Sequence, residues 1–167
     1  MKKCIILQIN YLILICLFIP CVAIAQPICQ IQRFSAYNGL AQRSVTNILQ
    51  DSKGFIWFST WNGLNKFDGY TFKNYKAFPG DGCTLTSNRL AKITQTQTCD
   101  IWCQTYDLRI YLFDSRREKF IDILRPYEAP KQQTYAVQNV YALPKGVSWI
   151  VCDRGAFRID EQAYKDQ

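Results

Sequence analysis

Histidine is absent from the 167-residue sequence. A Ser-His-Asp or Cys-His nucleophile system, a zinc site with an imidazole ligand and a phosphoacceptor histidine are therefore excluded for this chain. Methionine is nearly absent as well, since the initiator is the single one. Because these chemistries are missing, we expect a protein that is not an enzyme and that uses no cofactor.

The sequence also lacks a concentrated basic stripe. Its formal net charge is +7, but the lysines and arginines beyond the N-terminal region are scattered, and only Arg116 and Arg117 are adjacent. Nucleic-acid binding favours positive charge clustered on one face or along one element. The pattern therefore predicts a solvated surface and no nucleic-acid partner.

No apolar run of membrane-spanning length follows residue 25. Before that point, Lys2 and Lys3 precede a nearly uncharged apolar segment that ends in Ala23-Ile24-Ala25. This three-part pattern predicts a signal peptide over residues 1–25 and export to the periplasm. An uncleaved inner-membrane anchor is the alternative, because about 20 apolar residues can span a bilayer. In either case a membrane would be contacted only through the leader.

Three of the eight cysteines, Cys4, Cys16 and Cys21, fall in the predicted leader. The five that remain are Cys29, Cys83, Cys99, Cys103 and Cys152. Their odd number leaves at least one thiol free or paired with another chain. Cys99 and Cys103 are expected on one face of a strand, too far apart for a disulfide. The spacing indicates small apolar fillers and predicts no metal site.

One pattern is written three times after the leader, at a spacing of about 45 residues. Trp57, Trp102 and Trp149 mark the three copies. Twelve residues earlier stand Val45, Leu90 and Val137; nine earlier Ile48, Ile93 and Val140; three earlier Gly54, Cys99 and Gly146; six later Gly63, Leu108 and Gly155. A self-similar period of this length indicates one supersecondary unit stacked on itself.

Each copy has the pattern of short antiparallel strands joined by tight turns, which is typical of a propeller blade. The expected strands are 45–50, 55–60, 64–67 and 70–75 in copy one, 90–94, 101–105, 109–113 and 120–124 in copy two, and 137–143, 148–152 and 156–159 in copy three. The fourth strand of copy three is missing or only begun. We therefore predict an all-β chain, a partial β-propeller of about three four-stranded antiparallel blades that follows an apolar signal helix.

The predicted boundaries follow from these copies. They are a signal peptide at 1–25, a lead-in segment at 26–43, blade 1 at 44–78, blade 2 at 87–125 and a partial blade 3 at 135–167. Segments 79–82 and 126–130 are rich in Pro and Gly or flanked by Pro, and we expect them to be loops. Gly54, Gly63, Gly146 and Gly155 supply turns with positive φ, whereas Cys99-Asp100 and Asp107-Leu108 must make the turns of copy two.

The repeat predicts the role of two sets of residues, one in packing between blades and one in ligand binding. The three tryptophans, with Ile48, Ile93 and Val140, are expected to pack between neighbouring blades. The residues just past each Trp strand vary between copies and lie in loops at one end: Trp61, Asn62, Tyr106, Asp107, Asp153 and Arg154. Variable aromatic and charged groups on a common face are typical of a surface that binds a polar ligand. These six are the candidate ligand-binding residues, and plain solvated loops are the alternative.

The segment from Gly39 to Tyr70, GLAQRSVTNILQDSKGFIWFSTWNGLNKFDGY, closely resembles the two-component regulator propeller repeat. Residues 33–40 resemble the usual mature start of that family. Copy two resembles it less, because no Gly-Leu follows its Trp strand. The resemblance implies the periplasmic sensor region of a hybrid two-component histidine kinase, which takes part in signal transduction. It also implies an oligosaccharide from polysaccharide breakdown, or another extracellular cue, as the ligand.

A propeller closes with about four to eight blades, and the repeats in this sequence are fewer. Each unit buries its faces only against its neighbours, so the two end blades should expose apolar surface. We therefore expect an N-terminal fragment of a longer sensor, completed by missing blades or by other copies of itself. A short secreted binding or adhesion module that oligomerises is the alternative. A glycan-cleaving enzyme comes third, because it would need Asp107 and Asp153 paired across a site.

Overall fold

The computed structural model describes residues 11, 29–77, 85–128, 130 and 133–163. The predicted signal peptide, its cleavage site, the predicted loop at 79–82 and Cys83 lie outside the described residues. The chain divides into two units, Met1–Gln32 and Arg33–Gln167, and every strand of the described residues belongs to the second. No helix in the described part of the chain is both long and apolar enough to cross a membrane.

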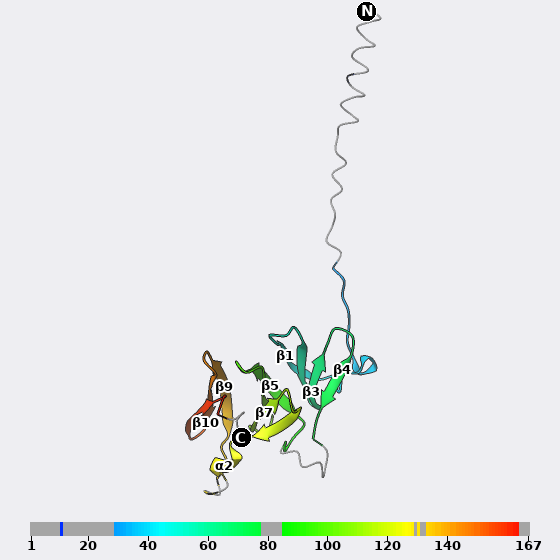
Figure 1. Ribbon diagram of the computed structural model, residues 1–167. Coiled ribbons are helices and arrows are strands. Elements are labelled where there is room, and N and C mark those ends of the chain that lie inside the picture. Colours follow the sequence, from blue (N-terminus) through cyan, green and yellow to red (C-terminus); the bar gives the residue numbers. More distant parts are fainter. Residues whose placement is uncertain (1–10, 12–28, 78–84, 129, 131–132, 164–167) are drawn as a thin grey trace, which may run out of the picture. The chain divides into compact units, whose positions relative to one another are not determined.

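Unit Arg33–Gln167 contains three antiparallel sheets, as the repeat predicts (Figure 1). The first sheet, blade 1, has the order β1-β2-β3-β4, with β1 Val45–Gln50, β2 Ile56–Thr60, β3 Gly63–Phe67 and β4 Phe72–Tyr75. It is preceded by a 3-10 turn, η1 Ala36–Asn38, which ends at Gly39 with φ 99°. Sequential strands are neighbours throughout, which is the up-and-down topology of a propeller blade.

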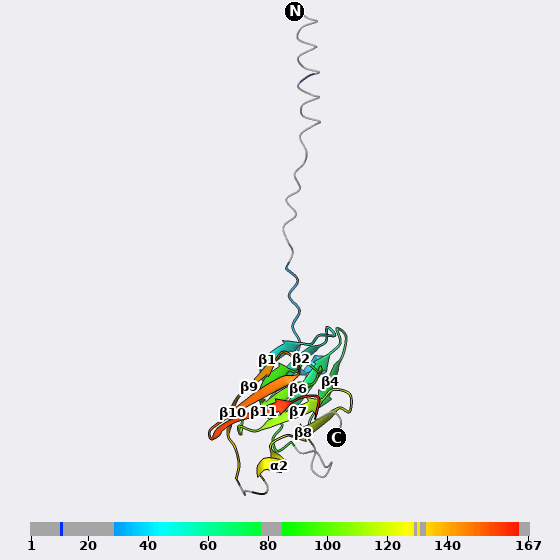
Figure 2. The ribbon, with the colours of Figure 1, turned by 60° about the vertical axis from the view of Figure 1, so that its left-hand side comes forward.

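Blades 2 and 3 repeat this topology. Blade 2 consists of β5 Leu90–Gln95, β6 Ile101–Thr105, β7 Ile110–Asp114 and β8 Lys119–Asp122. Blade 3 consists of β9 Val137–Leu143, β10 Val147–Cys152 and β11 Gly155–Asp160, with no fourth strand among the described residues. The fold prediction is therefore confirmed: the chain is a partial propeller. The first strands of successive blades lie beside one another, β1 next to β5 and β5 next to β9, and Figure 2 shows the three sheets one in front of another.

The turns of all three blades depend on left-handed backbone at equivalent positions. The residue three before each Trp has φ 89° at Gly54, 65° at Cys99 and 70° at Gly146. The residue six after each Trp has φ 99° at Gly63, 60° at Leu108 and 132° at Gly155. A left-handed residue with a side chain is strained, so blade 2 carries strain that the glycines of its neighbours avoid. Gly63 is required for a second reason, because a Cβ there would lie 2.3 Å from the Tyr75 carbonyl oxygen.

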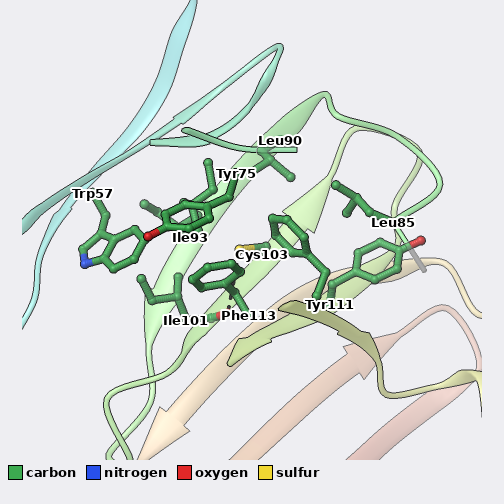
Figure 3. Packing of buried hydrophobic residues seen from close by; sticks show 11 residues of the cluster. Trp57, Tyr75, Leu85, Leu90, Ile93, Ile101, Cys103, Tyr111 and Phe113 are labelled. Carbon is green, nitrogen blue, oxygen red and sulfur yellow. Dashed lines mark hydrogen bonds between the residues drawn. The ribbon is translucent and has the colours of Figure 1, made fainter. Parts of the chain in front are cut away.

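The first hydrophobic core lies between blades 1 and 2. Blade 1 contributes Trp57, Leu64 and Tyr75, and blade 2 contributes residues of the opposite sheet face. The blade 2 members are Leu90, Ile93, Ile101, Cys103, Tyr111, Phe113 and Phe120. Figure 3 shows Trp57 and Tyr75 facing Phe113, Ile101 and Cys103. The ring centroids of Tyr75 and Phe113 are 4.7 Å apart, and the core therefore joins two sheets rather than the strands of one.

The second core repeats this arrangement one blade further on. Trp102, Ile110 and Leu112 of blade 2 face residues of blade 3. The blade 3 members are Val137, Val140, Ile150, Cys152 and Ile159. Each Trp thus faces the following blade, and the apolar residue nine before it faces the preceding one. We call these two sides the forward face and the backward face of a blade.

The packing prediction for the six repeat residues is confirmed at four positions and wrong at two. Trp57 and Trp102 are 2% and 0% exposed, and Ile93 and Val140 are each 4% exposed. Trp149 on the forward face of blade 3 is 38% exposed, and Ile48 on the backward face of blade 1 is 60% exposed. The physical reason is that no further sheet covers these two faces in the described part of the chain, so the equivalent side chains meet solvent.

Two local predictions are also wrong. The segment expected to be a plain loop at 126–130 begins with a helical turn, α2 Arg125–Glu128, because the Asp122 carboxylate accepts from the backbone N–H groups of Leu124 and Arg125. Cys99 lies on the left-handed turn before β6, as the repeat predicts, and not on the strand that the disulfide argument placed it on; its thiol lies 3.3 Å from the Ser52 hydroxyl. Cys103 and Cys152 are buried in the two cores, as predicted for apolar fillers.

Candidate functional site

One backbone hydrogen bond recurs in all three blades and defines one end of the sheets. The residue four after each Trp donates its N–H to the residue before the first strand of the same blade. These bonds join Trp61 to Ser44, Tyr106 to Arg89 and Asp153 to Ala136, at 3.3, 3.0 and 3.0 Å. The loops that follow β2, β6 and β10 therefore lie beside the starts of β1, β5 and β9. All six candidate ligand-binding residues belong to these loops, so the structure places them at the same end of their own blades.

At this end, blades 1 and 2 bring two candidate aromatic side chains together. Trp61 and Tyr106 meet edge to face with their ring centroids 6.0 Å apart, and both are exposed. The Arg89 guanidinium carbon lies 4.8 Å from the centre of the Trp61 ring, within the range of a cation–π contact. These three side chains form what we call the aromatic patch.

The aromatic patch is held by blade-to-blade hydrogen bonds beneath it. The Gly63 N–H donates to the Asn88 carbonyl oxygen at 2.8 Å, which ties the turn after Trp61 to the segment that leads into β5. The Thr46 hydroxyl donates to the Leu90 carbonyl oxygen at 2.9 Å. Because both bonds are to backbone, the spacing of Trp61 and Arg89 is fixed by the two sheets rather than by flexible side chains.

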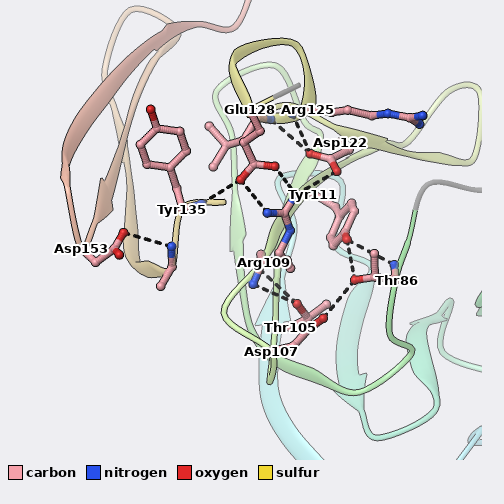
Figure 4. A network of polar contacts seen from close by, with 12 residues as sticks. Thr86, Thr105, Asp107, Arg109, Tyr111, Asp122, Arg125, Glu128, Tyr135 and Asp153 are labelled. Carbon is pink, nitrogen blue, oxygen red and sulfur yellow. Dashed lines mark hydrogen bonds and ion pairs between the residues drawn. The ribbon is translucent and has the colours of Figure 1, made fainter. Parts of the chain in front are cut away.

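The polar neighbours Asn62 and Asp107 have structural partners. The Asn62 amide donates to the Ala41 carbonyl oxygen at 3.4 Å, which links the turn to the lead-in segment. The Asp107 carboxylate accepts from the Thr86 hydroxyl at 3.0 Å, and that hydroxyl lies 2.7 Å from the Tyr111 hydroxyl (Figure 4). Asp107 nevertheless remains exposed at the loop surface, so one face of its carboxylate is open to a ligand.

The candidate residues of blade 3 do not join the aromatic patch. The Asp153 carboxylate accepts from the Ala136 N–H at 3.1 Å and lies 3.6 Å from the Arg154 guanidinium. Asp153 and Asp107 each have a hydrogen-bond partner of their own, and Figure 4 shows their side chains on different loops.

Arg109 forms the strongest charged cluster of the described chain and is not among the predicted residues. Its guanidinium donates to both oxygens of Glu128 at 2.6 Å and to Asp122 at 3.2 Å (Figure 4). Hydrogen bonds to Glu128 raise the pKa of Arg109. Burial acts to raise the pKa of Glu128, but the bonds from Arg109 and from the Tyr135 N–H outweigh it and lower that pKa. The cluster fastens α2 and the approach to β9 onto blade 2.

Comparison with known proteins gives this geometry its context. Residues 39–62 match the family described as Two component regulator propeller. The match covers the end of the lead-in, β1, β2 and the turn that bears Trp61, so the predicted resemblance of copy one is confirmed. The chain is also 47% identical over 53 residues to Histidine kinase P4 of Formosa agariphila, a stretch that is 32% of this chain and 4% of that protein.

Solved structures confirm the blade arrangement. The extracellular domain of a putative hybrid two-component system from B. thetaiotaomicron superimposes with a TM-score of 0.64 at 27% identity, over 79% of this chain and 19% of that one. The extracellular domain of a putative one-component system from the same organism gives a TM-score of 0.57 at 19% identity, over 83% of this chain and 19% of that one. The chain thus spans about a fifth of the length of these domains.

Proposed function

We propose that the chain acts as a non-catalytic periplasmic sensor module of a hybrid two-component histidine kinase system. In this role it contributes to the recognition of an extracellular ligand derived from a glycan, and to relay of the signal. The support comes from the propeller repeat at 39–62 and from the solved extracellular domain at 27% identity. The absence of histidine in the sequence supports a sensing rather than a phosphoryl-transfer role.

The observation that carries the ligand part of this proposal is the aromatic patch. Exposed aromatic rings on rigid loops offer apolar faces for the C–H groups of a sugar ring, while a nearby polar group fixes its orientation. Arg89 lies at one side of Trp61 and offers a planar set of donors that matches a carboxylate. An oligosaccharide that contains a uronic acid would use both features of the patch.

The position of the patch supports relay of a signal. Trp61 belongs to blade 1, whereas Arg89 and Tyr106 belong to blade 2. A ligand that touches all three stabilises one arrangement of the two blades over others, which is the requirement for transmission of a binding event. The first core also joins these blades, together with the ion pair of Lys73 and Glu118 at 2.6 Å.

A binding titration tests the ligand proposal. The full chain is exported to the periplasm of a Gram-negative host, purified and titrated with neutral and uronic-acid-containing oligosaccharides by isothermal calorimetry. We expect saturable binding of an acidic oligosaccharide that falls at least about tenfold, or about 1.4 kcal/mol, in Trp61→Ala and in Arg89→Ala.

Tyr70→Ala is the matched control for these variants. Tyr70 is 91% exposed on the turn that joins β3 and β4, at the opposite end of blade 1. Its removal should leave binding unchanged. Equal losses in Tyr70→Ala and Trp61→Ala, or binding that survives loss of both Trp61 and Tyr106, would exclude the aromatic patch as the ligand site.

A further inference from the structure

The first strands of the three blades form the inner edge of the sheet arrangement. The main contacts between neighbouring blades join β1 and β2 to β5, and β5 and β6 to β9. The blades of a propeller surround a central axis and diverge outward, so the strands at the closest approach lie nearest to that axis. Each first strand is also an edge strand, because it pairs with one neighbour in its sheet. Side chains of different blades therefore come closest together along β1, β5 and β9.

The composition of these three strands is unusual for its charge. They contain no acidic residue and one cationic residue, Lys92. Lys92 stands ten residues before Trp102, and the residues ten before the other two tryptophans are Asn47 and Asn139. We call Asn47, Lys92 and Asn139 the inner row. Because they occupy one position of the repeat, they lie at the same level of neighbouring first strands.

A β-bulge at the same place in each blade fixes the direction of the inner row. The ladder between the first and second strands shifts register at three equivalent pairs of residues, which are Val45 and Asn47, Leu90 and Lys92, and Val137 and Asn139. Such bulges re-aim side chains and are frequent next to binding and catalytic sites. Lys92 lies on the face opposite to its neighbour Ile93, which packs into the first core. The inner row therefore lies on the forward faces, and all three members are partly buried.

The inner row contains one hydrogen bond between blades. The Lys92 ammonium donates to the side-chain oxygen of Asn139 at 2.8 Å. The same oxygen accepts from the backbone N–H of Val140 at 3.0 Å. With its oxygen held from both groups, the Asn139 side chain turns its NH2 group away from the ammonium. An ammonium has three N–H donors, and this bond uses one of those of Lys92.

The other polar groups of the inner row are open N–H donors. Within the described part of the chain, no carboxylate lies at ion-pair distance from Lys92, and the side-chain amide of Asn47 has no hydrogen-bond partner. A partly buried cation with a neutral partner lacks the opposite charge that compensates for lost hydration. The free donors and the uncompensated charge both favour an anion.

A purely structural tie between blades 2 and 3 does not account for a lysine at this position. Asn139 offers a neutral oxygen, which a neutral donor would satisfy equally well. Blades 1 and 3 carry asparagine at the same position, so a blade folds without a cation there. The charge of Lys92 is an additional desolvation cost that the hydrogen bond does not require.

We propose that the inner row binds an oxyanion, held by the Lys92 ammonium together with the adjacent side-chain amides of Asn47 and Asn139. The anion is either the carboxylate of a sugar acid or a free inorganic ion. Because its donors belong to different blades, the bound anion links the blades at their inner edge. The inference goes beyond the proposed function, because this site is separate from the aromatic patch and uses Lys92 rather than Arg89.

An NMR titration of the full chain tests the proposal. The probes are galacturonate, inorganic sulfate and, as the uncharged control, galactose, all at constant ionic strength set with chloride. The side-chain N–H signals of Asn47 and Asn139 report on the site, and the indole signals of Trp57 and Trp102 report on folding. We expect saturable shifts of both amide signals with at least one anion and none with galactose. Shifts with galacturonate alone identify a sugar carboxylate, and shifts with sulfate alone identify an inorganic ion.

Substitutions at Lys92 separate the role of the charge from that of the hydrogen bond. Lys92→Gln keeps a donor for Asn139 but removes the cation, and it should weaken anion binding at least about tenfold without loss of folding. Lys92→Arg keeps the charge and should retain most of the binding. Lys145→Gln is the matched control, because Lys145 is exposed on the turn between β9 and β10, and it should bind like the unchanged chain.

Three outcomes would contradict the inference. The first is a folded chain whose Asn47 and Asn139 signals show no saturable shift with either anion. The second is equal binding by the unchanged chain and by Lys92→Gln, since the charge would then play no part. The third is a loss in Arg89→Ala as large as that in Lys92→Gln, because the anion would then belong to the aromatic patch. Binding of oligosaccharides by the aromatic patch is measured separately by calorimetry, so its failure leaves these outcomes unchanged.

Discussion

Blade 2 and blade 3 contain the same repeat but differ in what surrounds it. Trp102 has a blade beyond it and is fully buried, whereas Trp149 at the same position is 38% exposed. On the other side, Ile93 of blade 2 is 4% exposed and Ile48 of blade 1 is 60% exposed. The residue type determines how much apolar surface a repeat position can bury. Whether that surface is buried depends on the presence of a neighbouring sheet.

This difference shows where the free energy of the fold resides. Burial of a large side chain stabilises by about 1.5–3 kcal/mol relative to its exposure. The two cores between blades contain most of the buried aromatic and aliphatic residues. Stability in this chain therefore resides mainly between sheets, and the middle blade takes part in both interfaces.

Trp102→Ala and Trp149→Ala test the comparison at one repeat position. Trp102→Ala removes a buried ring and leaves Ser148 without its donor, so we expect a loss of about 3–5 kcal/mol in the free energy of unfolding. Trp149→Ala should cost only about 1 kcal/mol, since the ring is already partly solvated. Urea unfolding followed by far-ultraviolet circular dichroism measures both. Similar losses in the two variants would contradict the comparison.

Arg109→Ala tests the charged cluster that blade 2 uses to hold α2 and the approach to blade 3. Removal of Arg109 leaves Glu128 and Asp122 buried without their cation, and we expect a loss of about 3 kcal/mol in the free energy of unfolding, the lower end for a buried pair. Lys119→Ala, an exposed change on the same blade, is the control and should cost less than about 0.5 kcal/mol.

Acid pH should reproduce part of this loss. The pKa of Glu128 is lowered in the folded chain, so its contribution to stability is complete above the ordinary glutamate pKa and disappears as the pH falls through the lower, folded value. The free energy of unfolding should therefore decline below about pH 4. In Glu128→Gln the free energy of unfolding should decline less steeply with falling pH. An unchanged pH dependence would show that protonation of Glu128 does not contribute to the loss of stability.

Gly63→Ala tests the backbone requirement at the turn that carries the aromatic patch. A Cβ would lie 2.3 Å from the Tyr75 carbonyl oxygen at a residue with φ 99°. We expect a loss of about 2–3 kcal/mol, from left-handed strain together with displacement of β4. Gly69→Ala has φ 101° but meets nothing within 4 Å, so it should cost only about 1–2 kcal/mol from the backbone conformation. Thermal unfolding of the pair separates the contact from the conformation.

Lys73→Ala gives the smallest expected effect. Lys73 and Glu118 connect blades 1 and 2, but both side chains are more than two-fifths exposed. Exposed ion pairs contribute about 0–1 kcal/mol and are screened by salt. We expect a loss below about 0.5 kcal/mol that vanishes in high salt. A larger, salt-independent loss would mean that charged contacts rather than apolar burial join these blades.

The regular part of the fold can be predicted from the sequence because it depends on local signals. Alternating apolar residues give the strands, and the positions of Gly54 and Gly63 give the turns that the structure confirms. The repeat also identifies Cys99 and Leu108 as turn residues, because it aligns them with glycines. The repeat supplies this information because a glycine in one copy indicates a turn at the equivalent position of the other copies.

The remaining features depend on contacts between segments that are distant in sequence. Arg89 lies 28 positions beyond Trp61, and nothing in the sequence indicates that its guanidinium lies over that ring. The α2 turn at Arg125–Glu128 depends on Arg109, 19 residues before Glu128. The sequence does contain one signal for the charged cluster. Arg109 stands at the start of an otherwise apolar strand, and a buried arginine requires a nearby carboxylate.

Hydroxyl-radical footprinting of the full chain, analysed by mass spectrometry, tests the central claim most directly. It reports the solvent exposure of the four tryptophans in one sample. We expect Trp149 to be oxidised at a rate close to that of Trp61, and Trp57 and Trp102 to be protected by the blades that follow them. Protection of Trp149 equal to that of Trp102, or reactivity of all four rings alike, would contradict the proposed arrangement of covered and open blade faces.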